Sequence, residues 1–402
     1  VDLGMVKRYE RSADGVLHVT IALTTAGCPL RAEINNRVAN AVRALDGVEE
    51  VGIEFGVMLR AARNLGFEAE VVDVMDDLTF AEVPVLVVDG AMGTSIHKLD
   101  LDLEKDYLGK ENCTEVLVLT RPDAIRQIHA DYLAAGADAV ETDTFGAMPH
   151  VLCEFDLVDR CREINVKACQ LAREACDQYA TPENPRYVVG SMGPGTKLIS
   201  LGQVDWDTLY ASYHEQALGL IEGGADVILM ETCQDILMIK CALNAVLDAM
   251  EAMGVKPAVT AEENAAGGLP IMVQVTIENT GTMLTGTEIA AAAHALAGYP
   301  VMSVGMNCAT GPEDMAEHIK FLAKHWPKHI SILPNAGLPT LVAGETVYPL
   351  APEPFAQTMA RFADRFGLSI IGGCCGTTPE HIGAVRQAVG ERLAEKQAKK
   401  PL

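Results

Sequence analysis

The 402-residue sequence predicts an α/β protein, a (β/α)8 TIM barrel preceded by a small N-terminal α+β domain. A short apolar run followed by an amphipathic stretch recurs eight times from residue 85 onward. Most of these runs are continuously apolar, as in strands that are buried on both faces. Each run also ends in chemically distinctive residues, which favours one catalytic face at the C-terminal strand ends. A doubly wound open sheet is the alternative, although it usually has fewer strands.

The expected elements follow this repeat. We expect barrel strands at 85–89, 137–142, 187–191, 225–231, 271–277, 301–307, 330–335 and 368–373. We expect helices, from the spacing of apolar residues, at 125–133, 209–221, 236–250, 289–296, 315–322, 355–366 and 382–393. The stretch at 258–268 is expected to be an exposed insertion before the fifth strand.

Residues 1–80 form the expected first domain and its connector, and residues 81–402 the barrel. Within the first domain, 17–23 alternates as a strand, 29–45 has a helical pattern, and 48–55 is a second strand. The connector spans 59–84. Because the chain begins with Val inside a recognisable pattern, we expect an N-terminally trimmed fragment.

Charge and hydropathy exclude several classes of protein. The formal net charge is −24, and such a surface repels nucleic acid and anionic membranes, so neither is expected as a partner. No run approaches the roughly 20 apolar residues that span a bilayer. A signal peptide is not evident. We therefore expect a cytoplasmic protein.

Three of the eleven cysteines are candidate zinc ligands and catalytic residues. Cys308 ends the sixth expected strand, and Cys374 and Cys375 end the eighth. These strands flank the seventh in a closed barrel, so the three thiolates converge and form a soft, anionic site that suits Zn²⁺. The neighbouring glycines allow the bend that this requires. The alternative is a pair of buried thiols in a glycine-rich turn.

Three protein ligands leave one coordination position open, as in catalytic zinc sites. Asn335, at the end of the seventh strand, is the candidate oxygen donor for that position, or it hydrogen-bonds turn backbone. An anionic zinc–thiolate centre activates water poorly, which disfavours a zinc hydrolase. It favours deprotonation of a substrate thiol.

A thiol substrate that is an amino acid also needs partners for its ammonium and carboxylate groups. Asp89 and Glu231, at the ends of the first and fourth strands, are the candidates for the ammonium. Backbone amides of the turn from Gly90 to Gly93 are the candidates for the carboxylate. The alternative role of both acids is helix capping.

These motifs, in this order, resemble the homocysteine-binding module of cobalamin-dependent methionine synthase over residues 85–390. The matching stretches are DGAMGT, ETDTFGA, GSMGPG, ETCQD, GMNCATGP, PNAGLP and GGCCGTTPEHI. The resemblance implies that Cys308, Cys374 and Cys375 bind zinc and that Asp89 and Glu231 bind the amino group of homocysteine. It also implies methyl transfer from methylcobalamin to the homocysteine thiol, giving methionine. Betaine- and S-methylmethionine-dependent enzymes share the barrel and the zinc, so these donors are the alternatives.

Some residues depart from that family. Asp143 stands where the family more often has Asn, and Gly195 and Thr196 alter the turn after the third strand. Neither change removes a proposed ligand. The sequence shows no second barrel and no cobalamin domain, so methylcobalamin is expected to arrive on another domain or a corrinoid protein.

Residues 1–58 resemble the metal–sulfur cluster biosynthesis family of iron–sulfur assembly proteins, through VDLGMV, LTTAGCPL and LDGVEEVGIEF. Cys28 is the residue there that could touch a metal, or it is a thiol at a helix start. This domain supports a rival of another class, a non-catalytic metal carrier or scaffold. Such a protein would tolerate replacement of Asp89 and Glu231.

Overall fold

The computed structural model describes residues 6–11, 16–23, 50–57, 85–342 and 345–399, with side chains described for 85–341 and 346–392. The chain divides into two compact units, Val1–Thr79 and Phe80–Leu402. The expected helix at 29–45, the connector at 59–84 and Cys28 lie outside the described residues. Among the described residues, every helix is too short or too polar to span a bilayer.

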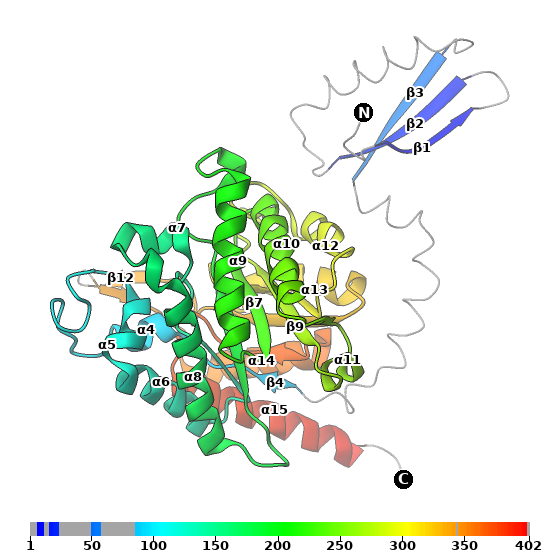
Figure 1. The fold of residues 1–402 in the computed structure, drawn as a ribbon. Coiled ribbons are helices and arrows are strands. Elements are labelled where there is room, and N and C mark those ends of the chain that lie inside the picture. Colours follow the sequence, from blue (N-terminus) through cyan, green and yellow to red (C-terminus); the bar gives the residue numbers. More distant parts are fainter. Residues whose placement is uncertain (1–5, 12–15, 24–49, 58–84, 343–344, 400–402) are drawn as a thin grey trace. The chain divides into compact units, whose positions relative to one another are not determined.

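The first unit contains a three-stranded sheet in the order β1-β2-β3 (Figure 1). Its strands are β1 (Val6–Arg11), β2 (Val16–Leu23) and β3 (Glu50–Val57). β2 and β3 pair in parallel over their full lengths, at the two positions that the sequence predicts. β1 pairs antiparallel with β2 and is an addition to the prediction. It was missed because four of its six residues are charged, which is common for edge strands.

The second unit is a parallel barrel of eight strands, so the predicted fold class is confirmed. The strands are β4 (Leu86–Val87), β5 (Ala139–Glu141), β6 (Tyr187–Met192), β7 (Val227–Cys233), β9 (Leu269–Val275), β10 (Ser303–Asn307), β11 (His329–Leu333) and β14 (Ile370–Ile371). The hydrogen-bonded order is β4-β14-β11-β10-β9-β7-β6-β5, and a parallel bridge between Val88 and Ala139 joins its two ends. β10 and β14 therefore both neighbour β11.

Helices surround these strands (Figure 1). They are α4 (Met92–Ile96), α5 (Leu117–Thr120), α6 (Pro122–Ala135), α7 (Pro149–Leu152), α8 (Cys161–Tyr179), α9 (Trp206–Glu222), α10 (Ile236–Ala252), α11 (Ala261–Ala265), α12 (Ile289–Leu296), α13 (Ala316–His325), α14 (Pro352–Phe366) and α15 (Pro379–Lys399). Short 3-10 turns lie at Thr114–Val116, Cys153–Phe155, Val158–Arg160, Ile199–Leu201 and Glu313–Met315. The expected insertion at 258–268 contains α11 and the end of the short strand β8 (Pro257–Ala258).

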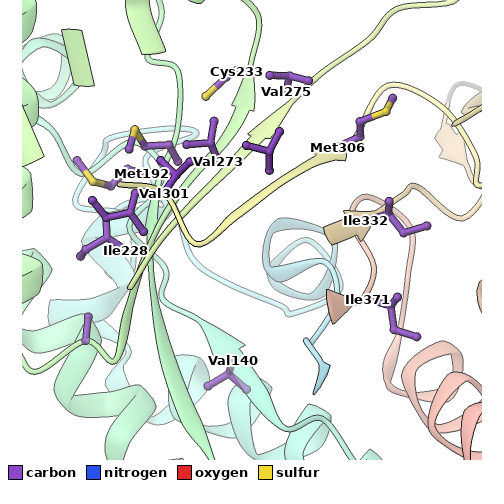
Figure 2. Close-up of a cluster of buried hydrophobic side chains, with 14 of the residues drawn as sticks. Val140, Met192, Ile228, Cys233, Val273, Val275, Val301, Met306, Ile332 and Ile371 are labelled. Carbon is purple, nitrogen blue, oxygen red and sulfur yellow. The ribbon is translucent and has the colours of Figure 1, made fainter. Parts of the chain in front are cut away.

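Two apolar layers hold the strands in place. The larger layer packs strand residues such as Val140, Ile228 and Val273 against the helices, and Figure 2 shows several of these side chains. The other face of the strands carries a smaller buried cluster, made of Val88, Ala139, Val189, Leu229, Met272, Leu333 and Ile370. Because both faces are buried, the strand ends are fixed in position, and so are the residues that follow them.

Candidate metal and substrate site

Three cysteine sulfur atoms meet at the C-terminal ends of β10 and β14. The Sγ of Cys375 lies 4.0 Å from that of Cys308 and 3.9 Å from that of Cys374. All three sulfur atoms lie within 4.8 Å of one another. A tetrahedral zinc with Zn–S bonds of about 2.3 Å requires sulfur separations of about 3.8 Å. The cluster is thus close to the size that such an ion requires.

Strand β11 and the residues that follow it lie between the two cysteine-bearing segments and are hydrogen-bonded to both. The backbone amide of Cys308 donates to Leu333 at 3.2 Å, and that of Cys374 donates to Pro334 at 2.8 Å. The amide of Ala336 donates to the carbonyl of Cys375 at 3.0 Å. These bonds keep the two segments in register, so the sulfur atoms converge by backbone geometry rather than by chance side-chain rotamers.

The backbone at the end of β10 is strained. Cys308 and Ala309 have φ values of 59° and 55°, in the left-handed region that residues with a Cβ rarely adopt. Such conformations persist where the surroundings impose them, and they concentrate at functional sites. Here the turn aims the Cys308 side chain at the other two thiols.

The three thiols share charge unequally. Hydrogen bonds from Cys308 and Cys374 lower the pKa of Cys375 to about 3. The Cys374 thiol donates hydrogen bonds to Cys308 and Cys375. These bonds hold the pKa of Cys374 well above its ordinary value, and burial adds to that rise. The cluster therefore carries negative charge at neutral pH, which favours a bound cation.

Glu231, at the end of β7, is fixed at both carboxylate oxygens. Ser191 Oγ donates to Glu231 Oε1 at 2.5 Å, and Asn307 Nδ2 donates to Glu231 Oε2 at 3.1 Å. Burial raises the pKa of Glu231 to about 7, and the nearby Cys375 adds to the rise. Ser191 and Asn307 were not among the predicted site residues, although each lies at the end of a predicted strand.

Two further acids lie near Glu231, of which Asp89 is buried and Glu141 is half-buried. The backbone amide of Glu141 donates to both carboxylate oxygens of Asp89, at 3.2 Å each. Burial raises the pKa of both acids well above the ordinary range, and the charge of Glu231 raises both further. Oε1 of Glu141 is buried and has no hydrogen-bond partner among the residues that the structure describes. The three acids favour their neutral forms when no cation is near, and a cation bound beside them would favour their ionised forms.

Asn335 and Gly90 occupy the predicted positions. Asn335 directly follows the Leu333–Pro334 end of β11 and is 3% exposed, and its Oδ1 has no partner in the described part of the chain. A side chain at Gly90 would meet Thr377 Oγ1 at 2.5 Å, so glycine is required there. The amide of Ala91, in the same turn, already donates to Thr377 Oγ1 at 3.2 Å. Because that amide already has an acceptor, the predicted carboxylate-binding turn has one fewer free backbone donor.

The residues that depart from the family pattern lie outside the sulfur cluster. Asp143 is buried, and burial followed by the charge of Glu115 raises its pKa well above the ordinary range. Glu115 Oε1 accepts a hydrogen bond from the Gly146 amide at 2.7 Å. Gly195 has a φ of 71° and lies against His150. These contacts shape the loops after β5 and β6.

An eight-stranded parallel barrel that gathers sulfur and carboxylate side chains at its C-terminal mouth is the architecture of a barrel enzyme. The chain belongs to the homocysteine S-methyltransferase family, whose family model matches residues 86–389. A second family model, described as iron–sulfur cluster assembly protein, matches residues 1–55. Both resemblances drawn from the sequence motifs are thereby confirmed.

Two curated relatives are methionine synthases. The chain is 45% identical over 332 residues to that of Mycobacterium tuberculosis (strain ATCC 25618 / H37Rv), covering 83% of this chain and 26% of the relative. It is 46% identical over 305 residues to that of Mycobacterium leprae (strain TN), covering 76% of this chain and 24% of the relative. The chain thus spans about a quarter of the length of these relatives.

Solved structures show the same fold. The oxidised form of the homocysteine methyltransferase MmuM from Escherichia coli matches with a TM-score of 0.58 and 21% identity, over 79% of this chain and 99% of that chain. Its metallated form matches with a TM-score of 0.57 and 21% identity, over 78% and 98%. At this identity the likeness concerns the barrel architecture.

Proposed function

We propose that the barrel transfers a methyl group from a methylcorrinoid to the sulfur of homocysteine, giving methionine, with zinc held by Cys308, Cys374 and Cys375. The observation that carries the proposal is the convergence of the three sulfur atoms, with separations of 3.9 and 4.0 Å about Cys375. Family membership supports homocysteine as the methyl acceptor.

The residues present fit a zinc ion. All three donors are sulfur atoms, which zinc accepts in tetrahedral sites, and three protein ligands leave one position for a substrate. Oδ1 of Asn335 has no partner among the described residues, which makes this amide the candidate oxygen donor for that position in the absence of substrate. When bound, the zinc supplies a Lewis acid that lowers the pKa of the homocysteine thiol and leaves its sulfur electron-rich.

The chain's own acids bind the other end of homocysteine. Glu231 and Asp89 are proposed to pair with the ammonium group, whose positive charge offsets the repulsion between their carboxylates. Ser191 and Asn307 hold Glu231 in place before the substrate arrives, which reduces the entropy lost on binding. The pocket thereby orients the sulfur of homocysteine toward the cysteine cluster.

The proposed methyl donor is methylcobalamin, bound to another domain or protein. The identity to methionine synthases and the DGAMGT, PNAGLP and GGCCGTTPEHI stretches support this donor over betaine and S-methylmethionine. In the transfer, the homocysteine sulfur supplies the electron pair of its new bond to the methyl group, and the pair of the broken bond stays with the donor. The thiol proton leaves to solvent.

The test is a methyl-transfer assay of the zinc-loaded chain with homocysteine and each of the three donors in turn. We expect methionine from methylcobalamin, about one zinc per chain, and loss of zinc and activity in Cys308→Ala with the fold retained. Methionine formed with betaine or S-methylmethionine, but not with methylcobalamin, would show that the methyl donor is that compound instead. No methionine from any donor, with zinc still bound, would favour the metal-carrier alternative.

A further inference from the structure

Tyr348 lies against the cysteine turn, although nothing in its sequence context marks it as a site residue. It follows the hairpin of β12 (Thr340–Val342) and β13 (Glu345–Val347), which is inserted between β11 and α14. A Cβ placed on Gly376 would lie 2.1 Å from Cγ of Tyr348 and 2.4 Å from its Cβ. The ring therefore packs directly on the glycine that follows Cys375.

The position of Tyr348 is set by bonds to the cysteine turn itself. The amide of Leu350 donates to the carbonyl of Ala336 at 2.9 Å, and the amide of Ala336 donates to the carbonyl of Cys375 at 3.0 Å. The carbonyl of Leu350 also lies 2.9 Å from Nε2 of His381. Tyr348 is thus two residues from Leu350, which is linked to the Cys375 segment through Ala336.

The polar end of Tyr348 faces the sulfur atoms. Its side chain lies within hydrogen-bonding reach of the Cys375 thiol. A phenol is protonated at neutral pH and can donate a hydrogen bond to sulfur.

Resting on the function proposed above, we propose that Tyr348 is a positioning residue of the zinc site, which donates a hydrogen bond to the Cys375 sulfur and holds the ligand cluster in its binding geometry. Hydrogen bonds from outside the ligand set orient metal ligands, and their loss typically weakens metal affinity by about 10- to 100-fold. Zinc with three thiolates carries a net negative charge, so a donor to one thiolate also stabilises the loaded site.

Gly376 is the second part of this arrangement. Its φ of 78° lies in the left-handed region, and the ring of Tyr348 leaves no room for a Cβ. Glycine is therefore required at 376 both for the turn and for the approach of the tyrosine. The turn that brings Cys374 and Cys375 to one metal is the same turn that admits Tyr348.

The test compares the full chain with Tyr348→Phe, which keeps the ring on Gly376 and removes only the hydroxyl. Tyr210→Phe is the matched control, because Tyr210 lies on α9 and bonds to Asp248 rather than to the cluster. Zinc affinity is measured by competition with a chromophoric chelator, without homocysteine or donor. We expect about tenfold weaker zinc binding in Tyr348→Phe and no change in the control.

Cobalt(II) substitution supplies a second readout, because the sulfur-to-cobalt charge-transfer band reports hydrogen bonding at the sulfur. Loss of the donor makes the thiolate a stronger electron donor, so we expect a shift to lower energy in Tyr348→Phe, with or without homocysteine. Unchanged affinity and spectrum would overturn the proposal. A change that disappears when homocysteine is added would also overturn it, because Tyr348 would then be a direct ligand that the substrate displaces.

These outcomes are separable from failure of the proposed function. If Cys308→Ala binds as much zinc as the unmodified chain, the zinc site itself is wrong, and Tyr348 has nothing to position. If Cys308→Ala loses zinc while Tyr348→Phe matches the unmodified chain, only the role of Tyr348 is wrong.

Discussion

At the scale of single residues, Glu231 combines two properties that oppose each other. Ser191 and Asn307 donate to its two oxygens and favour the ionised form, whereas burial favours the neutral form and brings its pKa to about 7. A buried carboxyl in this balance changes charge readily when a cation binds beside it. Ammonium recognition by Glu231 should therefore depend on pH near neutrality.

We predict that Glu231→Gln weakens binding of methionine, the proposed product, by about 10- to 100-fold, because a charge-assisted hydrogen bond is lost. Methionine carries the same ammonium as homocysteine but no titrating thiol. In the unmodified chain, affinity should rise as the pH increases through about 7, since only the ionised carboxylate attracts the ammonium. That rise in affinity should be smaller in the variant, where only Asp89 and Glu141 remain to contribute to the pH dependence. Isothermal titration at several pH values measures both effects.

Glu251→Gln, at an exposed position of α10, is the control and should match the unmodified chain. Equal methionine affinity in Glu231→Gln and the unmodified chain would remove Glu231 from substrate binding. Equal affinity at all pH values in the unmodified chain would instead show that the carboxyl does not titrate in that range.

At the scale of elements, the end of β10 shows local strain next to a proposed ligand. Ala309 has a φ of 55° and cannot relax, because the Cys308 amide is bonded to Leu333 and the Thr310 amide to the Cys308 carbonyl at 2.7 Å. A left-handed conformation costs an alanine about 1–2 kcal/mol. Glycine avoids that cost, but it lowers the stability of the protein by about 0.4–1 kcal/mol, because the unfolded chain has greater conformational freedom.

The first effect is larger, so we predict that Ala309→Gly stabilises the zinc-free protein by about 0.5–1 kcal/mol. Denaturant unfolding with excess chelator measures the change in free energy. The control is Ala323→Gly within α13, where the helical alanine is unstrained and the same substitution should cost about 1 kcal/mol. Destabilisation by Ala309→Gly would mean that the alanine methyl packs favourably enough to outweigh the strain.

The elements also show what a sequence can reveal. Continuous apolar runs predicted the eight barrel strands, because a buried parallel strand needs apolar residues on both faces. Strand order then predicted that Cys308, Cys374 and Cys375 lie close together, which the sulfur separations bear out. Tyr348 was not predictable in this way, because its contact with Gly376 depends on how an inserted hairpin folds back. Glu141 lay within a recognised motif, but only the coordinates show that its Oε1 is buried and has no hydrogen-bond partner within the described ranges.

At the scale of the whole molecule, the sulfur and carboxylate residues of the site all belong to the second compact unit. The strands that carry them, β4, β5, β7, β10 and β14, pair within one barrel, and their apolar layers draw on the same unit. The first unit has a sheet of its own and a separate family match at residues 1–55. Each unit thus has its own sheet and its own family match, which is consistent with separate roles.

We predict that a chain beginning at Phe80 folds, binds about one zinc per molecule and has the zinc affinity of the full chain, because every proposed ligand and the strands between them remain. Circular dichroism tests the fold, and chelator competition measures the affinity. We hypothesise that the first unit, in which residues 1–55 match the iron–sulfur cluster assembly model, acts in metal delivery or partner docking. Removal should then lower zinc occupancy in cells grown with limiting zinc, while affinity in the purified protein is unchanged. Equal occupancy in those cells would exclude a delivery role, and a lower affinity in the purified barrel would show that the first unit supports the site directly.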